Sequence, residues 1–124
     1  MSAETPEETM GKMLGKALYV VTTSPARGPG LREVLPAHLE YQVKLEREGK
    51  LFGAGPLFDE GGEAPVAGMI VLRAGSYDEA RALADQDPFH AKGLRSYTIQ
   101  KWKMNEGAMT LTIRYSDQSV IVAD

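Results

Sequence analysis

Hydrophobic and polar residues follow two different periods along the chain, and each change of period marks an expected element. A β-branched and aromatic run over residues 17–23 predicts a strand, which ends at Ser24-Pro25. Residues 31–48 change to the helical period, and Gly49 follows in the position of a left-handed cap. The residues that share one face of this helix are Leu31, Val34, Leu35, His38, Tyr41, Gln42 and Leu45.

The second half of the chain adds strands and one more helix. Residues 51–54 predict a short edge or bulged strand among glycines and a proline, and residues 67–72 predict a continuous apolar strand. A capping box from Ser76 to Glu79 begins a helix that should end near Asp87, because Pro88 disfavours helical backbone before it. The apolar stripe of this helix is Tyr77, Ala80, Leu83 and Ala84. Residues 96–104 predict a fourth strand, and residues 109–122 predict a terminal hairpin.

This order of elements predicts an α+β fold, the ferredoxin-like β-α-β-β-α-β sandwich, followed by a C-terminal β-hairpin. Two helices then cover one face of a four-stranded antiparallel sheet. The strands at 17–23 and 67–72 are apolar at both parities, which is typical of strands buried on both faces. A second subunit is the most economical cover for the other face. We therefore expect a homodimer in which two sheets pair as a dimeric α/β barrel.

The length of 124 residues is enough for one domain. We expect residues 1–15, which are acidic and polar, to form a mobile leader, and residues 16–124 to form one domain. Its core spans about 18–104 and an extra hairpin spans 105–124. The first residues show no secretory signal and no apolar run could span a bilayer, so we expect a cytoplasmic protein.

Charge and cysteine content narrow the possible functions. The net charge of -3 offers no general attraction to nucleic acids or acidic membranes, so we expect neither partner. The absence of cysteine excludes disulfide scaffolds, thiolate zinc sites and cysteine nucleophiles. No Gly-x-Ser-x-Gly elbow occurs either, which favours proton transfer on a small molecule over acyl transfer.

His38 lies in the middle of the apolar stripe of the first helix and should point toward the sheet. It has two interpretations. One is a structural histidine that is hydrogen-bonded in the core. The other is a general base, because histidine titrates near neutral pH and its surroundings can tune it.

Asp87 continues the inward stripe of the second helix, four residues after Leu83. Asp before Pro is also common turn chemistry. At a helix C-terminus the carboxylate opposes the macrodipole, which favours a nearby cation or donor. If both helices lie on one sheet face, Asp87 and His38 can meet as a dyad in which Asp87 fixes the imidazole tautomer.

Further signals are weaker. Tyr41, His90 and Trp102 are candidate substrate-binding residues, although Trp102 also fits a core or dimer interface. The basic stretch after Asp87 could steer an anionic substrate or form a solvated face. Gly53-Ala54-Gly55 fails the dinucleotide fingerprint, since Phe58 replaces its last glycine, and no metal-binding spacing of histidines occurs. We expect no cofactor and no metal.

Several segments together resemble the YCII (YciI-like) family. These are Leu35-Pro36-Ala37-His38-Leu39-Glu40-Tyr41, Gly49-Lys50-Leu51-Phe52-Gly53-Ala54-Gly55-Pro56-Leu57, Ser76-Tyr77-Asp78-Glu79-Ala80 and Asp87-Pro88-Phe89-His90-Ala91-Lys92-Gly93-Leu94. The resemblance covers residues 18–102 and implies a dimeric ferredoxin-like barrel with His38 and Asp87 as the active-site pair. One family member removes hydrogen chloride from a chlorinated hydroxyhydroquinone, and the fold is shared with muconolactone isomerase-like enzymes.

Two functions follow as expectations. The first is a lyase or isomerase that uses His38 and Asp87 for acid-base chemistry on a small cyclic hydroxylated or carbonyl compound, without a cofactor. The second is a non-catalytic module that binds a small ligand or a partner at the same pocket, with the pair as a structural contact.

Overall fold

A computed structural model describes residues 3–123 of the chain. It divides into two compact units, one formed by residues 16–103 and the other by residues up to Gly15 together with those from Met104 onward. Met1 and Ser2 of the expected leader and Asp124 of the expected hairpin segment lie outside the described residues. The helices described contain no segment long and apolar enough to cross a membrane.

The larger unit contains a four-stranded sheet formed by β1 (Lys16–Thr23), β2 (Leu51–Leu57), β3 (Ala67–Leu72) and β4 (Tyr97–Met104). The strand order is β2-β3-β1-β4, and β3 pairs antiparallel with both of its neighbours. Strand β2 is longer than expected and continues through Pro56 to Leu57. Its predicted edge position and bulge are confirmed, since the register shifts between Leu51 and Gly53. A proline is tolerated there because an edge strand has an unpaired side.

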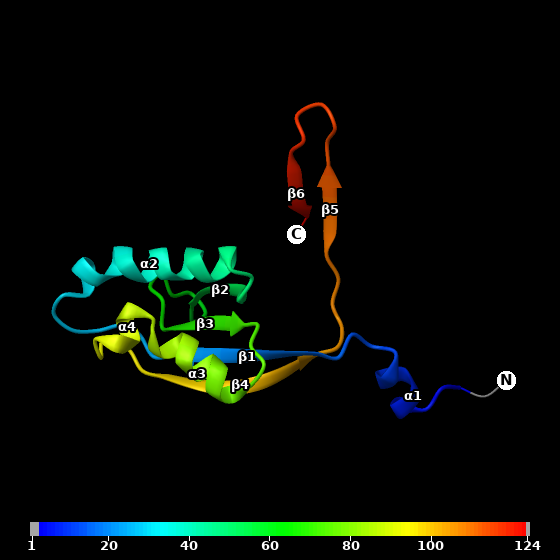
Figure 1. The fold of residues 1–124 in the computed structure, drawn as a ribbon, viewed down its shortest axis with the longest axis horizontal. Helices are drawn as coiled ribbons and strands as arrows, with labels where there is room; N and C mark the ends of the chain where they lie inside the picture. Colours follow the sequence, from blue (N-terminus) through cyan, green and yellow to red (C-terminus); the bar gives the residue numbers. More distant parts are fainter. Residues whose placement is uncertain (1–2, 124) are drawn as a thin grey trace. The chain divides into compact units, whose positions relative to one another are not determined.

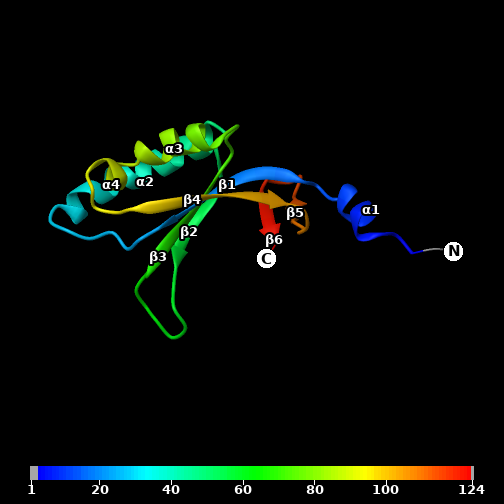
Figure 2. The same cartoon turned by 90° about the horizontal axis from the view of Figure 1, so that it is seen from below.

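Three helices lie on one face of this sheet (Figures 1 and 2): α2 (Leu31–Arg47), α3 (Tyr77–Asp85) and α4 (Pro88–Ala91). Gly49 follows the C-cap of α2 and has a φ of 75°, the left-handed conformation that the sequence predicted. Ser76 caps the start of α3, where its side chain accepts a hydrogen bond from the Glu79 amide. The short helix α4 was not predicted. The architecture is thus α+β, with helices on one side of a mainly antiparallel sheet.

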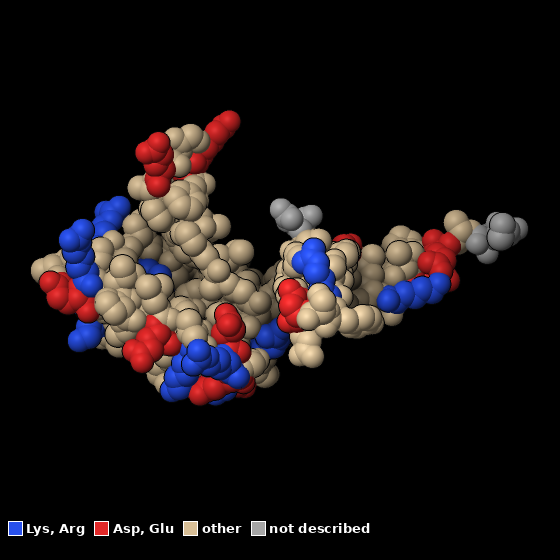
Figure 3. Space-filling view, turned by 90° about the horizontal axis from the view of Figure 1, so that it is seen from above, with Lys and Arg blue, Asp and Glu red and all other residues tan. Residues whose placement is uncertain are grey.

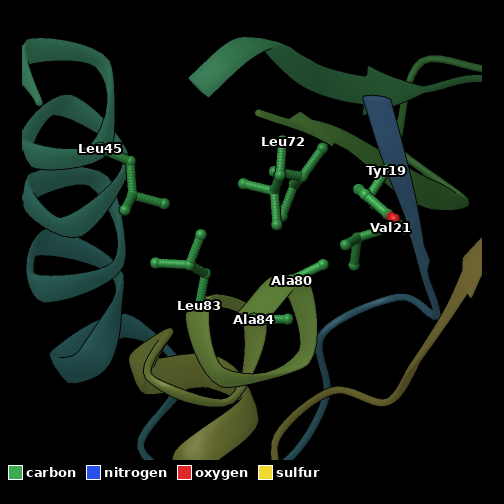
Figure 4. Close-up of a cluster of buried hydrophobic side chains, with 8 residues drawn as sticks. Tyr19, Val21, Leu45, Leu72, Ala80, Leu83 and Ala84 are labelled. Carbon is green, nitrogen blue, oxygen red and sulfur yellow. The ribbon is translucent and has the colours of Figure 1, made fainter. Parts of the chain in front are cut away.

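The core lies between these helices and the sheet (Figure 4). Leu45 from α2 and Leu83 from α3 pack against sheet residues that include Tyr19, Val21 and Leu72. The small residues Ala80 and Ala84 let α3 approach the strands closely, and both are buried. Leu35, which was expected on the inward stripe, remains 43% exposed at its margin.

Apolar residues also occupy the sheet face that points away from the helices. Leu18 and Val71 are buried there within the single chain, whereas Met69 remains 40% exposed. The rings of Phe52 and Trp102 meet edge to face at 6.2 Å, and both remain partly exposed. The chain therefore covers part of this face itself and leaves the rest open.

The smaller unit contains α1 (Pro6–Gly11), β5 (Thr110–Ile113) and β6 (Val120–Ala123). Helix α1 occupies the segment for which the sequence predicted no element, and Thr5 caps it through the Glu8 amide. Strands β5 and β6 form the predicted antiparallel hairpin.

Basic and acidic side chains are mixed over the face of the molecule shown in Figure 3, in line with the small net charge.

Candidate active site

His38 and Asp87 are in direct contact beneath the helical layer. His38 Nδ1 lies 2.9 Å from Oδ1 and 2.8 Å from Oδ2 of the Asp87 carboxylate. The His38 side chain is 13% exposed and that of Asp87 is 1% exposed. This contact gives the buried carboxylate a hydrogen-bond partner, and it leaves the second ring nitrogen of the histidine available for another hydrogen bond or a proton.

Local backbone structure explains why Asp87 points inward, and it corrects one expectation. Helix α3 already ends at Asp85, so Asp87 does not occupy a helix C-terminus. It is the N-cap of α4, and its Oδ1 accepts a hydrogen bond of 2.9 Å from the Phe89 amide. Pro88 fits the first position of α4 because that position needs no amide donor. The turn chemistry of Asp-Pro and the inward contact with His38 therefore occur together.

Further donors hold the Asp87 carboxylate. Its Oδ2 accepts from Gln42 Nε2 at 3.0 Å and from Arg95 Nη2 at 3.2 Å. Burial alone raises the pKa of Asp87, but hydrogen bonds from His38 and the Phe89 amide and the charges of His38 and Arg95 outweigh it, so the pKa is lowered. Asp87 is thus an ionised carboxylate at neutral pH.

The geometry around His38 distinguishes its two ring nitrogens. The ring stacks on Phe89 at a centroid distance of 4.3 Å, which fixes its plane. Because Asp87 is ionised, Nδ1 must carry the proton of their hydrogen bond, so the lone pair of a neutral His38 ring is on Nε2. Among the described residues Nε2 has no hydrogen-bond partner, and it is not one of the buried unpartnered atoms.

His90 is part of the same cluster but has no free nitrogen. Its Nδ1 lies 2.7 Å from the Ala84 carbonyl, and its Nε2 accepts a hydrogen bond of 2.9 Å from Arg95 Nε. Burial, assisted by the neighbouring Arg95 charge, lowers the pKa of His90. These contacts require a neutral ring that supports Arg95, and they leave no nitrogen for a substrate.

Arg95 and Gln42 are the members of the cluster that sequence reasoning missed. Gln42 was visible on the inward stripe, one turn after His38, without a signal for its role. The Arg95 side chain is 9% exposed and lies 5.2 Å over the Phe89 ring, although its basic sequence context suggested a solvated face. No feature of the sequence distinguishes it from the exposed Lys92.

The structure places Tyr41 and Trp102, the two other candidate substrate-binding residues, on different sides of the sheet. The Tyr41 hydroxyl donates a hydrogen bond of 2.6 Å to the Leu83 carbonyl, which joins α2 to α3. Burial, with the nearby charges of Asp87 and Glu48, raises the pKa of Tyr41 to about 12. Trp102 occupies the sheet face opposite the helices, so a single chain does not bring it to His38.

Space near the pair is limited within one chain. A cavity of about 10 Å³ lies beside Asp87 and Tyr41, which is room for about one water molecule. A hollow of about 790 Å³ follows the outer side of α2, and neither His38 nor Asp87 lines it. In the described part of the chain, no group of three or more acidic or histidine side chains is arranged to hold a metal ion.

Two comparisons place the chain among known proteins. The uncharacterized protein YjpA of Bacillus subtilis is 32% identical over 75 residues, which are 60% of this chain and 82% of YjpA. The solved structure of 5-chloro-2-hydroxyhydroquinone dehydrochlorinase (TftG) from Burkholderia phenoliruptrix, in complex with 2,5-dihydroxybenzoquinone, shares the fold. It superposes with a TM-score of 0.56 and 24% identity, over 69% of this chain and 93% of TftG.

The family assignment rests on a longer match. Residues 16–103 match the YCII-related domain, and this range includes the four-stranded sheet, its three helices and the cluster around Asp87. The chain therefore belongs to the YCII-related domain family.

Proposed function

We propose that this protein is a cofactor-independent lyase or isomerase in which His38 is the general base. The proposal rests on the different surroundings of the two nitrogens of the His38 ring. Nδ1 is bound to an ionised carboxylate, whereas Nε2 has a lone pair and no partner among the described residues.

The chemistry follows from this geometry. Nε2 takes a proton from a small cyclic compound that bears hydroxyl or carbonyl groups, and the resulting imidazolium is stabilised by Asp87. In an elimination, the electrons of the broken bond form a double bond while a leaving group such as chloride departs with its bonding pair. In an isomerisation, the imidazolium returns the proton to another atom. The substrate class is supported by the fold shared with TftG, whose solved complex holds 2,5-dihydroxybenzoquinone.

The residues around His38 and Asp87 contribute to the proposed reaction by holding these two side chains in position. Arg95 and Gln42 hold Oδ2 of Asp87, and the Phe89 amide holds Oδ1. We propose these residues as positioning groups, since they fix the carboxylate that fixes the imidazole. His90 supports Arg95 in the same way.

We further propose that the unit of residues 16–103 has the ferredoxin-like topology and that two copies pair through the open sheet faces as a dimeric α/β barrel. The strand order β2-β3-β1-β4, the placement of the helices on one face and the partly exposed Met69, Phe52 and Trp102 on the other support this assembly. A partner sheet on these side chains would bring Trp102 into a closed interior.

Chloride release from 5-chloro-2-hydroxyhydroquinone is the direct test. We expect turnover by the native chain, a loss of about 10²–10⁴-fold in His38→Gln, and little change in the exposed control Lys92→Gln. Circular dichroism checks that each variant is folded. A folded His38→Gln protein that releases chloride at the native rate would contradict the proposed base.

A second candidate is a module that binds a small ligand without turnover, with His38 and Asp87 as a structural contact, and the burial of both side chains favours it. Calorimetric titration with 2,5-dihydroxybenzoquinone separates the two. Binding without any chloride release, undiminished in His38→Gln, would support the module.

A further inference from the structure

Arg95 has one free donor edge beside the pair of His38 and Asp87. Its Nε donates to His90 and its Nη2 donates to Asp87, whereas its Nη1 has no hydrogen-bond partner among the described residues. Nη1 is not one of the buried unpartnered atoms, so it reaches solvent although the side chain is only 9% exposed. His38 Nδ1 and Arg95 Nη2 bind the same oxygen, Oδ2 of Asp87, at 2.8 Å and 3.2 Å. A guanidinium edge is therefore open next to the proposed base.

Thr23 supplies a second unpaired donor at the same place. Thr23 is 3% exposed, and its Oγ1 is buried without a hydrogen-bond partner. Thr23 pairs with Gly68 across the sheet, and the point where a Cβ of residue 68 would lie is 2.8 Å from Thr23 Oγ1 and 3.8 Å from Arg95 Nη1. Both polar atoms thus lie around one spot above Gly68. Buried hydroxyls normally have a partner, so an unpaired one beside a free guanidinium edge points to a ligand.

The sheet is small-sided and partly uncovered at this spot. Gly68 and its partner Pro56 continue the helix-side face of the sheet beyond Ile70, because directly paired residues of antiparallel strands point to the same side. Gly68 is half-buried and Pro56 is exposed, so the helices leave this end of the face partly open. A Cβ at position 68 would contact both donors, and glycine keeps this side of them free of a side chain.

We propose that Arg95 Nη1 and Thr23 Oγ1 form an oxyanion subsite, which selects small substrates that carry an acidic hydroxyl group. The inference rests on the proposed function of His38 as the general base. When Nε2 of His38 removes a proton, the electron pair of the broken bond is delocalised onto a hydroxyl or carbonyl oxygen of the substrate, which becomes an oxyanion. A guanidinium N–H and a buried hydroxyl that the fold already holds in place are strong donors to such an oxygen. Arg95 thus has two roles, since Nη2 positions Asp87 and Nη1 binds the substrate.

Binding of 2,5-dihydroxybenzoquinone, whose hydroxyl groups are ionised at neutral pH, tests the subsite without turnover. Thr23→Val keeps the shape of the side chain and removes the hydroxyl. We expect it to raise the Kd about tenfold or more in calorimetric titration, the typical effect of losing a hydrogen bond to a charged group. Thr23→Ser keeps the hydroxyl and should bind like the native chain. Thr22→Val is the matched control, because Thr22 pairs with Met69 on the other face of the sheet.

Unfolding and a neutral analogue separate a ligand contact from a structural role. Because Thr23 Oγ1 has no partner in the described chain, Thr23→Val should leave the urea midpoint unchanged or higher, whereas a structural hydroxyl would lower it. The neutral 2,5-dimethoxybenzoquinone should bind the native chain about tenfold more weakly than the dihydroxy compound, and Thr23→Val should reduce this ratio.

A substitution at Gly68 tests the open side of the two donors. Gly68→Ala places a methyl group against Thr23 Oγ1 and should weaken binding of the dihydroxy compound in the same way as Thr23→Val. Gly55→Ala is its control, because a Cβ at position 55 would meet no atom within 4 Å. Circular dichroism checks that both variants are folded.

The subsite and the proposed base fail in different ways. The subsite is overturned if Thr23→Val binds 2,5-dihydroxybenzoquinone like the native chain, if Thr22→Val weakens binding equally, or if the native chain does not bind this compound. Chloride release that is lost in His38→Gln, with a Kd unchanged by Thr23→Val, would overturn the subsite and leave the base standing. A Kd raised by Thr23→Val, with no chloride release by the native chain, would support the subsite and contradict the proposed function.

Discussion

The cluster around Asp87 and the C-terminal hairpin differ in which kind of side chain they bury and which kind they expose. The cluster buries a carboxylate, a guanidinium and two imidazoles, whereas the hairpin exposes leucine, isoleucine and valine. Burying charge costs free energy unless every group is bonded, and Asp87 has donors from His38, Gln42, Phe89 and Arg95.

The hairpin has no comparable set of hydrogen bonds, and Leu111, Ile113, Val120 and Val122 on one of its faces are between 49% and 63% exposed. The two regions therefore differ in which of their groups lack a partner. In the cluster, Gln42 Oε1 is buried without a partner, whereas His38 Nε2 has no partner and is not among the buried unpartnered atoms, which points to chemistry at Nε2. The hairpin leaves a whole face of aliphatic side chains partly exposed.

The largest expected effect concerns the cluster as a catalytic unit. Asp87→Asn and His38→Gln should each lower turnover by about 10²–10⁴-fold, and the double variant should cost little more than the worse single change, because coupled residues are not additive. Steady-state kinetics on a chlorinated hydroxyhydroquinone measure this. Additive losses would show that the two side chains act separately.

Arg95→Met tests how much stability the protein loses when Asp87 and His90 each lack one hydrogen-bond donor. It removes the donor to Asp87 and leaves His90 Nε2 without its partner, so we expect a loss of about 3 kcal/mol in the free energy of unfolding. Urea unfolding measures it. Lys92→Met, an exposed change nearby, should alter stability by less than about 0.5 kcal/mol. Equal effects of the two variants would mean that the Arg95 contacts contribute nothing.

The same substitution in both regions sharpens the comparison. Val21 is fully buried beside Asp87, and Val120 is 58% exposed on the hairpin. Val21→Thr buries a new hydroxyl and should cost about 1–3 kcal/mol, whereas Val120→Thr should cost less than about 0.5 kcal/mol in dilute protein. Equal losses in the two variants would contradict this difference in burial.

The smallest expected effect is a dependence of stability on pH. His90 has a lowered pKa in the folded chain, so below its unfolded value of about 6.5 the unfolded state binds more protons and stability falls as pH decreases. Asp87 contributes only at lower pH, because its lowered pKa keeps it ionised, and Arg95 stays charged. His90→Asn should flatten the fall between pH 7.5 and 5.5, approximately, as followed by urea unfolding. An unchanged slope would assign it to other groups.

Sequence periodicity predicted most elements and the pairing partners of the candidate site. The helical phase of His38 and of Leu83 to Asp87 was sufficient to infer that both side chains point inward, and the structure brings them together. Helix α4 was missed because four residues are too few to show a period. The position of Asp87 as an N-cap, and not at a helix end that opposes the dipole, depends on that short helix.

The sequence by itself determined the α+β class, the apolar residues on both faces of β1 and β3, and the hairpin, because these follow from local periodicity and turn residues. Only the tertiary structure decided that Arg95 and Gln42 reach the same carboxylate, that His90 has no free nitrogen and that Trp102 lies on the other sheet face. These outcomes depend on contacts between residues distant in sequence, such as His38 and Asp87. A local pattern indicates which way a side chain points, but not which side chain it meets.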